Sequence, residues 1–194
     1  MNINEVTFDN FLSLSIDEQN QILNDFDLLK LLVKKNISDH RYLHSLSVAK
    51  TCKELAICHN VDSNKAYLAG LLHDCCKFKD ESILLEYLNK YDKDKINGCI
   101  GAYHSWVAPY YLKEKLNFSD KEILNAIYNH TILNSEDKLS LILYIADKRE
   151  PLRGINDGLL EKAKVDLIGV YKELVKDVEE FVKSKNERFI KNSI

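Results

Sequence analysis

Residues 69–74 read Ala-Gly-Leu-Leu-His-Asp, an apolar run that ends in an imidazole and a carboxylate. Burying an unpartnered polar or charged group is costly, so His73 and Asp74 need a partner at the end of a buried segment. Neighbouring residues on a helix point about 100° apart, so both side chains can reach one ion only near a helix end or deep between helices. A metal ion at such a place would satisfy both.

The spacing of hydrophobic residues outside this segment is helical nearly throughout. The chain of 194 residues has only two prolines and six glycines, and it lacks the alternating apolar runs that indicate strands. We therefore expect an all-α protein, a helical bundle with a metal site in its core.

Composition restricts the classes of partner. The net charge is −3 and no block of Lys or Arg dominates, so a nucleic acid is not expected to bind. No apolar run approaches the roughly 20 residues of a membrane span, and the first ten residues have no basic stretch typical of a signal peptide. We expect a cytoplasmic protein without a membrane partner. Its five cysteines are odd in number and irregularly spaced, which predicts free thiols.

Capping signals predict where several helices begin. Ser15–Glu18 and Ser119–Glu122 both have the S-x-x-E pattern of a capping box. Asp39 is expected to cap a helix over about residues 40–59, and Asp62 or Ser63 the next one. The predicted buried stripe of the first of these helices is Leu43, Leu46, Val48, Ala49, Leu55 and Ala56. Further helices are expected near residues 80–90, 104–116, 120–130, 137–148 and 157–190.

The first 35 residues form one or two predicted helices that contain neither His nor Cys. We expect residues 1–35 to be a helical extension packed on the core, with the chemistry carried by residues 36–194. The sequence has no internal repeat or low-complexity tract that would indicate a further domain.

Other polar residues also follow apolar runs. His130 ends the run of residues 123–128, Asp147 follows residues 141–146, and His44 lies on the helix predicted over residues 40–59. Three separate helices therefore carry an imidazole or a carboxylate into the predicted core. A surface stripe would not repeat this arrangement.

Each of these residues also has a simpler interpretation. Taken singly, His44 and His130 are more often hydrogen-bonded core or cap histidines, and Asp147 could cap a helix or pair with Arg149. His59 lies near a predicted helix end and is expected to be structural. His40 is left open, as a partner of a metal ligand or a residue of the pocket rim. Considered together with His73 and Asp74, the set favours a metal site.

Imidazole and carboxylate ligands without thiolate suit iron, manganese, zinc and similar divalent ions. Four ligands would hold one ion: His44, His73, Asp74 and Asp147. Adding His104 and His130 gives six, which could hold two ions with Asp74 as a bridge. Two ions about 3.5–4 Å apart can stabilise both the attacking and the leaving oxygen in phosphoryl displacement.

These residues resemble the HD superfamily of metal-dependent phosphohydrolases. The order H…HD…D is matched by His44, by His73-Asp74 and by Asp147, and residues 69–77 extend the match to Ala-Gly-Leu-Leu-His-Asp-x-x-Lys. A closer resemblance, over residues 39–153, is to the YqeK family of symmetrical dinucleoside tetraphosphatases. It rests on residues 40–45, 69–77, 126–131 and 146–153, and on His104 followed by Asp120.

The resemblance implies an HD domain over residues 36–194, a two-metal iron site and hydrolysis of diadenosine tetraphosphate to two ADP. The implied metal ligands are His44, His73, Asp74, His104, His130 and Asp147. We expect a metal-bound hydroxide to attack a central phosphorus, with Asp74 and Lys77 as the catalytic residues. Arg41, Lys77 and Arg153 are predicted phosphate contacts, and Thr131 a hydrogen-bond donor to phosphate.

Alternative functions share the same metal core. The chain could be an HD-type nucleotide phosphatase or phosphodiesterase of other specificity, a non-catalytic module that senses nucleotides, or a purely structural helical domain. The expected partner is a small-molecule nucleotide, and the sequence leaves open whether the chain forms a homodimer.

Overall fold

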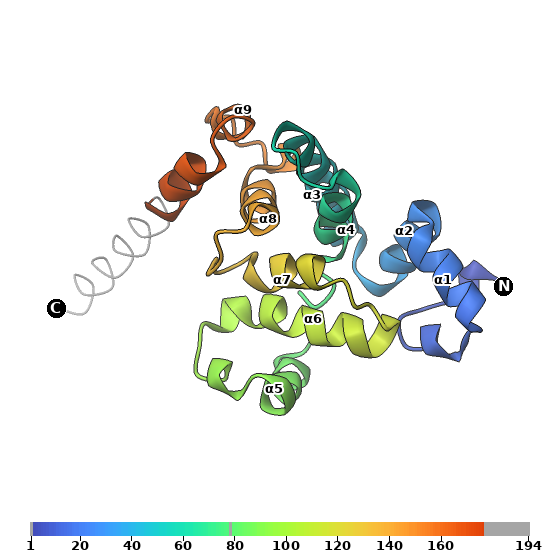
Figure 1. Ribbon diagram of the computed structural model, residues 1–194. Coiled ribbons are helices and arrows are strands. Elements are labelled where there is room, and N and C mark those ends of the chain that lie inside the picture. The colour runs from blue at the N-terminus through green and yellow to red at the C-terminus, as the bar shows by residue number, and fades with distance from the viewer. Residues whose placement is uncertain (1, 78, 177–194) are drawn as a thin grey trace.

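The computed structural model describes residues 2–77 and 79–176, and all regular secondary structure in these residues is helical (Figure 1). The all-α prediction is confirmed. The α-helices are α1 (Ile16–Asn24), α2 (Phe26–Asn36), α3 (Asp39–Cys58), α4 (Ser63–Leu72), α5 (Glu81–Tyr91), α6 (Tyr103–Leu116), α7 (Lys121–Asn129), α8 (Lys138–Arg149) and α9 (Leu159–Ala163). Short 3₁₀ turns are η1 (Ile3–Glu5), η2 (Phe11–Ser13), η3 (Lys93–Lys95), η4 (Ile100–Ala102) and η5 (Pro151–Arg153).

Helices α3, α4, α7 and α8 form the centre of the molecule. Helix α3 packs against α4 and α8, and α7 packs against both α4 and α8. The contact between α3 and α4 is close at Gly70, where a Cβ atom would lie 2.6 Å from Ala49 Cα. Glycine is therefore required at this point of α4 if the two backbones are to approach as they do.

Helices α1 and α2 lie at one end of the molecule and α9 at the opposite end (Figure 1). The segment before α3 joins the common hydrophobic core, in which Phe8, Phe11 and Leu29 are buried. The Phe8 N–H also donates to Asn36 Oδ1 at 3.0 Å, which ties the first residues to the end of α2. The division at residue 35 into an extension and a domain stays a prediction.

Two predicted caps are correct and two are displaced by one residue. Ser15 forms the expected capping box with Glu18, and Asp62 caps α4. Asp120, not Ser119, caps α7, because its carboxylate accepts from the N–H groups of the second and third helical residues. Ser38, not Asp39, caps α3 in the same way: its backbone is extended and its hydroxyl accepts from the N–H of the third helical residue.

The predicted buried stripe of α3 is wrong at one position. Val48, Ala49, Leu55 and Ala56 are buried, whereas the side chain of Leu43 is 56% exposed. The remaining member of the stripe, Leu46, is half-buried. The first turns of α3 border a cavity rather than a packed interface, so the apolar face of this helix extends beyond the core.

The long helix predicted over residues 157–190 is also wrong. Helix α9 ends at Ala163, residues 164–166 form a turn, and residues 167–176 are again helical. Asp166 starts this second helical segment, because its carboxylate accepts from the Gly169 N–H at 2.8 Å. The rest of the prediction lies outside the described residues.

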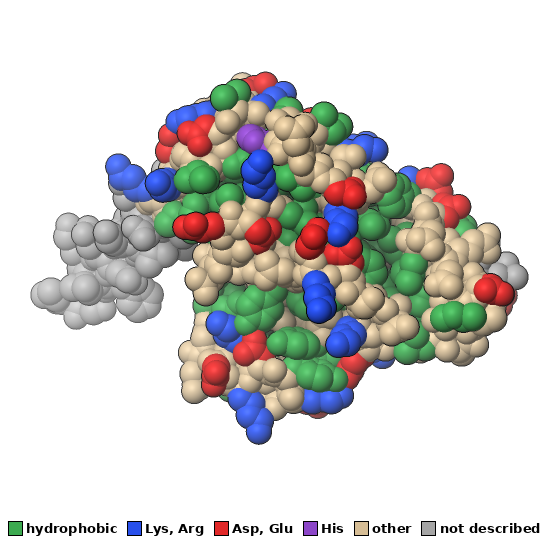
Figure 2. All heavy atoms as spheres, viewed as in Figure 1, with side chains coloured by type: hydrophobic (Ala, Val, Ile, Leu, Met, Phe, Trp, Pro, Cys, Tyr) green, Lys and Arg blue, Asp and Glu red, His purple; other side chains and the backbone are tan. Residues whose placement is uncertain are grey.

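On the face shown in Figure 2, acidic and basic side chains are interspersed rather than gathered into one block of either sign. Among the helices of the described residues, none is both long and apolar enough to cross a lipid bilayer.

Candidate metal centre

The ends of several helices bring the predicted ligands together. His44 lies in α3, His73 and His130 immediately follow α4 and α7, and Asp147 lies near the end of α8. His104 lies in the first turn of α6. Five predicted ligands are buried and Asp147 is half-buried. For His73, His130 and Asp147 the placement follows from the apolar runs, because each run forms a buried helix and the polar residue lies at or near its end.

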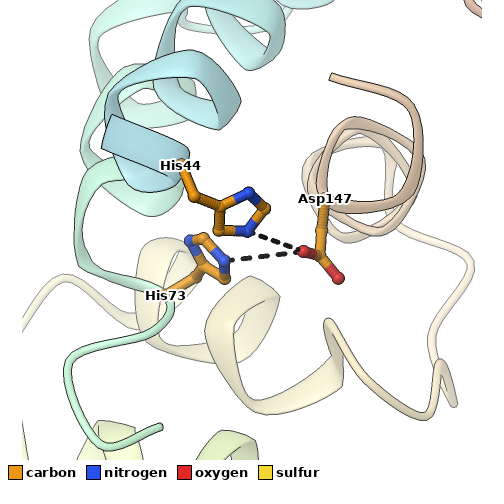
Figure 3. Close-up of side chains that lie close together, drawn as sticks. All are labelled: His44, His73 and Asp147. Carbon is orange, nitrogen blue, oxygen red and sulfur yellow. Dashed lines mark hydrogen bonds and ion pairs between the residues drawn. The ribbon is translucent and has the colours of Figure 1, made fainter. Parts of the chain in front are cut away.

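One group of possible ligands consists of His44, His73 and Asp147, whose side chains point toward one another (Figure 3). His44 Nε2 lies 3.1 Å and His73 Nε2 3.7 Å from Asp147 Oδ1. All three ligand atoms lie within 4.8 Å of one another. That spacing is compatible with a single ion held between three helices.

A second group, His73, Asp74 and His130, meets the same 4.8 Å limit. The two oxygens of Asp74 face different imidazoles: Oδ2 lies 3.3 Å from His73 Nε2, and Oδ1 lies 3.6 Å from His130 Nε2. His104 Nε2 lies 3.4 Å from Asp74 Oδ1 and 3.1 Å from His130 Nε2. Asp74 thus stands between two sets of nitrogens, as a bridging carboxylate would.

The imidazoles are oriented by their other ring nitrogens. The Nδ1–H of His73 donates to the Gly70 carbonyl, and that of His130 to the Ile127 carbonyl, each at 2.7 Å. A carbonyl can only accept, so in the neutral form of each ring the lone pair is on Nε2, which faces the cluster. This is how proteins fix the tautomer of a metal-binding histidine.

The residues present fit a divalent ion. Nε2 of His73 is fully buried and has no hydrogen-bond partner among the described residues. Leaving a buried polar atom without a partner costs about 1–3 kcal/mol, and a cation coordinated there would remove that penalty. Imidazole nitrogens and carboxylate oxygens are also the donor types that divalent transition metals bind.

The electrostatics of the site favour the metal-binding forms of its groups. Burial alone would raise the pKa of Asp74, yet the imidazoles around it, His73 first, hold that pKa well below its usual range. Burial lowers the pKa of His130 to about 4 and also lowers that of His104, so both rings are neutral at pH 7. The carboxylates are therefore charged and these imidazoles are not.

His73 behaves differently. Burial would lower its pKa, but the carboxylates of Asp74 and Asp147 outweigh burial and raise the pKa to about 10. Positive charge is therefore favoured at His73, the residue that both possible ligand groups contain. A bound cation would supply that charge in place of the proton.

All four predicted substrate contacts line one cavity of about 740 Å³, together with every predicted ligand except His73: Arg41, Lys77, Thr131 and Arg153. Arg41 donates to Asp74 Oδ2 at 2.6 Å, and Arg153 Nη2 lies 3.0 Å from Asp147 Oδ1. Lys77 Nζ lies 3.3 Å from His104 Nε2, as does Thr131 Oγ1. Their roles toward a substrate stay predictions.

The remaining histidines lie apart from the two groups. His40 is exposed and lies on the lining of the cavity. His59 Nε2 donates to the Ala163 carbonyl at 2.6 Å, a bond between the ends of α3 and α9. Arg149, the alternative partner considered for Asp147, forms an ion pair with Asp157 at 2.7 Å.

Sequence reasoning gave no role to two residues of the site. Glu150 is buried and accepts from His44 Nδ1 at 3.0 Å and from the Leu152 N–H at 2.6 Å. The sequence signal that could have identified Glu150 was its spacing of three residues from Asp147, which places both on one face of a helix. Lys148 donates to the His130 carbonyl at 3.2 Å and lies 3.7 Å from Asp147 Oδ2; burial lowers its pKa to about 8.

Comparisons with known proteins agree with this geometry. The model of the HD domain family matches residues 41–152. A protein of Halalkalibacterium halodurans named "Bis(5'-nucleosyl)-tetraphosphatase, symmetrical" is 31% identical over 170 residues, covering 80% of this chain and 86% of that protein. A Mycoplasma genitalium protein named "Probable nicotinate-nucleotide adenylyltransferase/Ap4A hydrolase" is 36% identical over 160 residues, 78% of this chain.

The chain spans 46% of the length of that Mycoplasma relative, so it corresponds to about half of it. Among solved structures, an HD superfamily hydrolase from Clostridium acetobutylicum, described as involved in NAD metabolism, superposes with a TM-score of 0.74. The two chains are 29% identical, and the match covers 89% of each.

Proposed function

This chain belongs to the HD domain family, and we propose that it is a metal-dependent hydrolase that cleaves symmetrical dinucleoside tetraphosphates, diadenosine tetraphosphate to two ADP. The observation that carries the proposal is the convergence of imidazoles and carboxylates on the buried, unpartnered Nε2 of His73. The substrate class is supported by the relatives named for that activity at about 30% identity.

The proposed metal centre is a two-ion iron site bridged by Asp74. The residues that would hold the ions are His44, His73, Asp74, His104, His130 and Asp147. When bound, such a pair supplies hydroxide at neutral pH and offsets charge on the attacking and leaving oxygens. Metal analysis of the purified protein tests the identity of the ions, and manganese is the main alternative.

In this proposal the cationic side chains of the chain bind the polyphosphate of the substrate. A dinucleoside tetraphosphate carries several negative charges, and a protein with a net charge of −3 must meet them locally. Arg41, Lys77 and Arg153 line the cavity and would orient the phosphates, with Thr131 as a hydrogen-bond donor. Attack at a central phosphorus then releases a nucleoside diphosphate, a good leaving group that needs little help from a general acid.

A product assay with diadenosine tetraphosphate tests the proposal. We expect ADP as the product of the metal-loaded protein. AMP together with ATP would mean attack at a different phosphorus, and tight nucleotide binding without turnover would favour a sensing module.

Substitution tests the assignment of the centre. Asp74→Ala should remove metal and activity together, because it deletes the proposed bridge. The matched control is Asp94→Ala, which changes an exposed aspartate and should leave both unchanged. If Asp74→Ala hydrolyses the substrate as fast as the wild type, the proposed site is wrong.

A further inference from the structure

Two exposed leucines border the cavity of the proposed metal centre. Leu43 of α3 is 56% exposed and Leu152 of η5 is 65% exposed, and both line this cavity. The other large apolar side chains of comparable exposure in the described part of the chain do not line it. Single exposed leucines are common on proteins, but two from distant segments that border one cavity lined mainly by charged residues and histidines form a specific surface.

The turn that carries Leu152 is fastened to the proposed metal ligands on both sides. Glu150 accepts from the Leu152 N–H at 2.6 Å and from His44 Nδ1 at 3.0 Å. Arg153, the next residue, reaches Asp147 Oδ1 at 3.0 Å. These hydrogen bonds hold the turn in a fixed position relative to the proposed metal centre. Leu152 is therefore exposed at a defined place.

The leucines and the ligands suit different parts of a nucleotide. The interior of the cavity is lined by cations, imidazoles and carboxylates, which match phosphates and metal ions. The side chains of Leu43 and Leu152 offer only apolar surface, which gains free energy when it covers another apolar surface. The flat faces of a nucleobase are the part of a nucleotide that offers such surface.

We propose that Leu43 and Leu152 contact one nucleobase of the substrate while its phosphates occupy the metal-lined interior. This inference rests on the proposed function for the identity of the substrate, and it adds the residues that distinguish a nucleotide from a bare polyphosphate. It also accounts for the exposure of Leu43, whose position in the apolar stripe of α3 predicted a buried side chain.

The test compares ADP with inorganic pyrophosphate as ligands of the metal-loaded protein. Leu43→Ser and Leu152→Ser should each weaken ADP binding by about fivefold through lost apolar contact, and leave pyrophosphate binding and metal content unchanged. The matched control is Ile57→Ser, which removes an apolar side chain that is 63% exposed on the same helix α3. It should change neither affinity.

Equal losses for both ligands, or no loss for either, overturn the inference, as does a wild-type protein that binds ADP no more tightly than pyrophosphate. A loss of dimerisation in the leucine variants with ADP affinity intact overturns it too, because a second copy would then cover the leucines. The two proposals fail separately. If the wild type hydrolyses the substrate and the leucine variants bind ADP as tightly as the wild type does, only the base contact is refuted. If the variants bind ADP more weakly and pyrophosphate as before, but the wild type does not hydrolyse the substrate, only the hydrolysis is refuted.

Discussion

Asp74 is a buried carboxylate whose negative charge is compensated by the groups around it. Its Oδ2 accepts from Arg41 at 2.6 Å, while Oδ1 faces His104 and His130. A carboxylate that is 3% exposed is tolerated only when such partners compensate its charge. The fold therefore keeps Asp74 charged and oriented in the absence of an ion, and a cation that binds there meets a preformed ligand.

Lys77 tests the separation of substrate contact from metal binding. It lines the cavity, and an ammonium group offers hydrogen-bond donors but no lone pair for a metal ion. We expect Lys77→Ala to keep its metal and to raise KM by about tenfold or more, since a charge-assisted hydrogen bond to phosphate is lost. Lys50→Ala, at an exposed position of α3, is the control for steady-state kinetics. Loss of metal, or an unchanged KM, would contradict the assignment.

Glu150 is a positioning residue for His44. In Glu150→Gln the amide oxygen can still accept one of the two present hydrogen bonds, but its NH₂ group replaces an acceptor by a donor. We expect metal affinity to fall about 10- to 100-fold, with activity restored by excess metal, because the partners of metal-binding histidines contribute that much. Glu161→Gln, an exposed glutamate, is the control. A metal titration that matches the wild type would rule this role out.

At the scale of elements, the site depends on the contact between α3 and α4. The Cβ of Gly70→Ala would meet backbone atoms of Ala49 at 2.6–2.7 Å, which cannot move aside as a side chain can. We expect a loss of about 1–3 kcal/mol in the free energy of unfolding, together with weaker metal binding, since the Gly70 carbonyl orients His73. Urea unfolding measures the first and metal titration the second.

The matched control is Gly101→Ala, whose Cβ would meet nothing closer than Cys99 Sγ at 3.6 Å. It should leave the unfolding midpoint and the metal affinity nearly unchanged. If the two alanine variants behave alike, the close helix contact does not have the importance assigned to it.

Helices α5 and α6 are joined by an ion pair with a defined pH range. Hydrogen bonds from Lys90 and Tyr91 lower the pKa of Glu114 from 4.5 to about 2. Because the pKa is lowered on folding, the stabilisation is fully present above about pH 4.5 and is lost as the pH falls toward 2. We expect Glu114→Gln to be slightly less stable than the wild type at pH 7, as befits a partly exposed pair, and the difference to shrink by pH 3. Denaturant unfolding of both proteins at the two pH values would show a constant difference if the pair were irrelevant.

The elements were predictable where local chemistry decides them. Caps and apolar periodicity place most helix ends within a few residues, and the errors are local as well. Ser119 and Asp120 both satisfy a capping pattern, and only the observed hydrogen bonds of Asp120 distinguish them. Periodicity identified the apolar face of α3 but could not show that the core opens into a cavity at Leu43. Periodicity likewise missed the break before Asp166, whose side chain caps the start of a new helical segment.

The candidate site was predictable for a related reason. A polar residue that ends a buried run must have a partner, and this argument found His73, His130 and Asp147 without knowledge of the fold. It did not find Glu150, because an acid before a proline looks like an ordinary helix end. The partner of Glu150, His44, is 106 residues away in the sequence, and only the tertiary structure shows the pair.

For the molecule as a whole, the proposed ligands connect segments that the hydrophobic core also joins. Residues of α3 and α8 and residues that follow α4 and α7 meet at one point, and these four helices pack directly on one another. A bound ion would thus cross-link helices far apart in sequence. An ion that binds the folded chain and not the unfolded one must stabilise the whole fold.

Metal removal should therefore lower the stability of the entire molecule. With free metal at 100 times its dissociation constant, binding adds about 2.7 kcal/mol to the free energy of unfolding, so a chelator should shift the thermal midpoint down by several degrees. His73→Gln, which lacks the residue shared by both ligand groups, should unfold at the same temperature with and without chelator. Equal midpoints for the loaded and stripped wild-type protein would mean that the imidazoles and carboxylates hold no ion that the fold requires, and their convergence would then need another explanation.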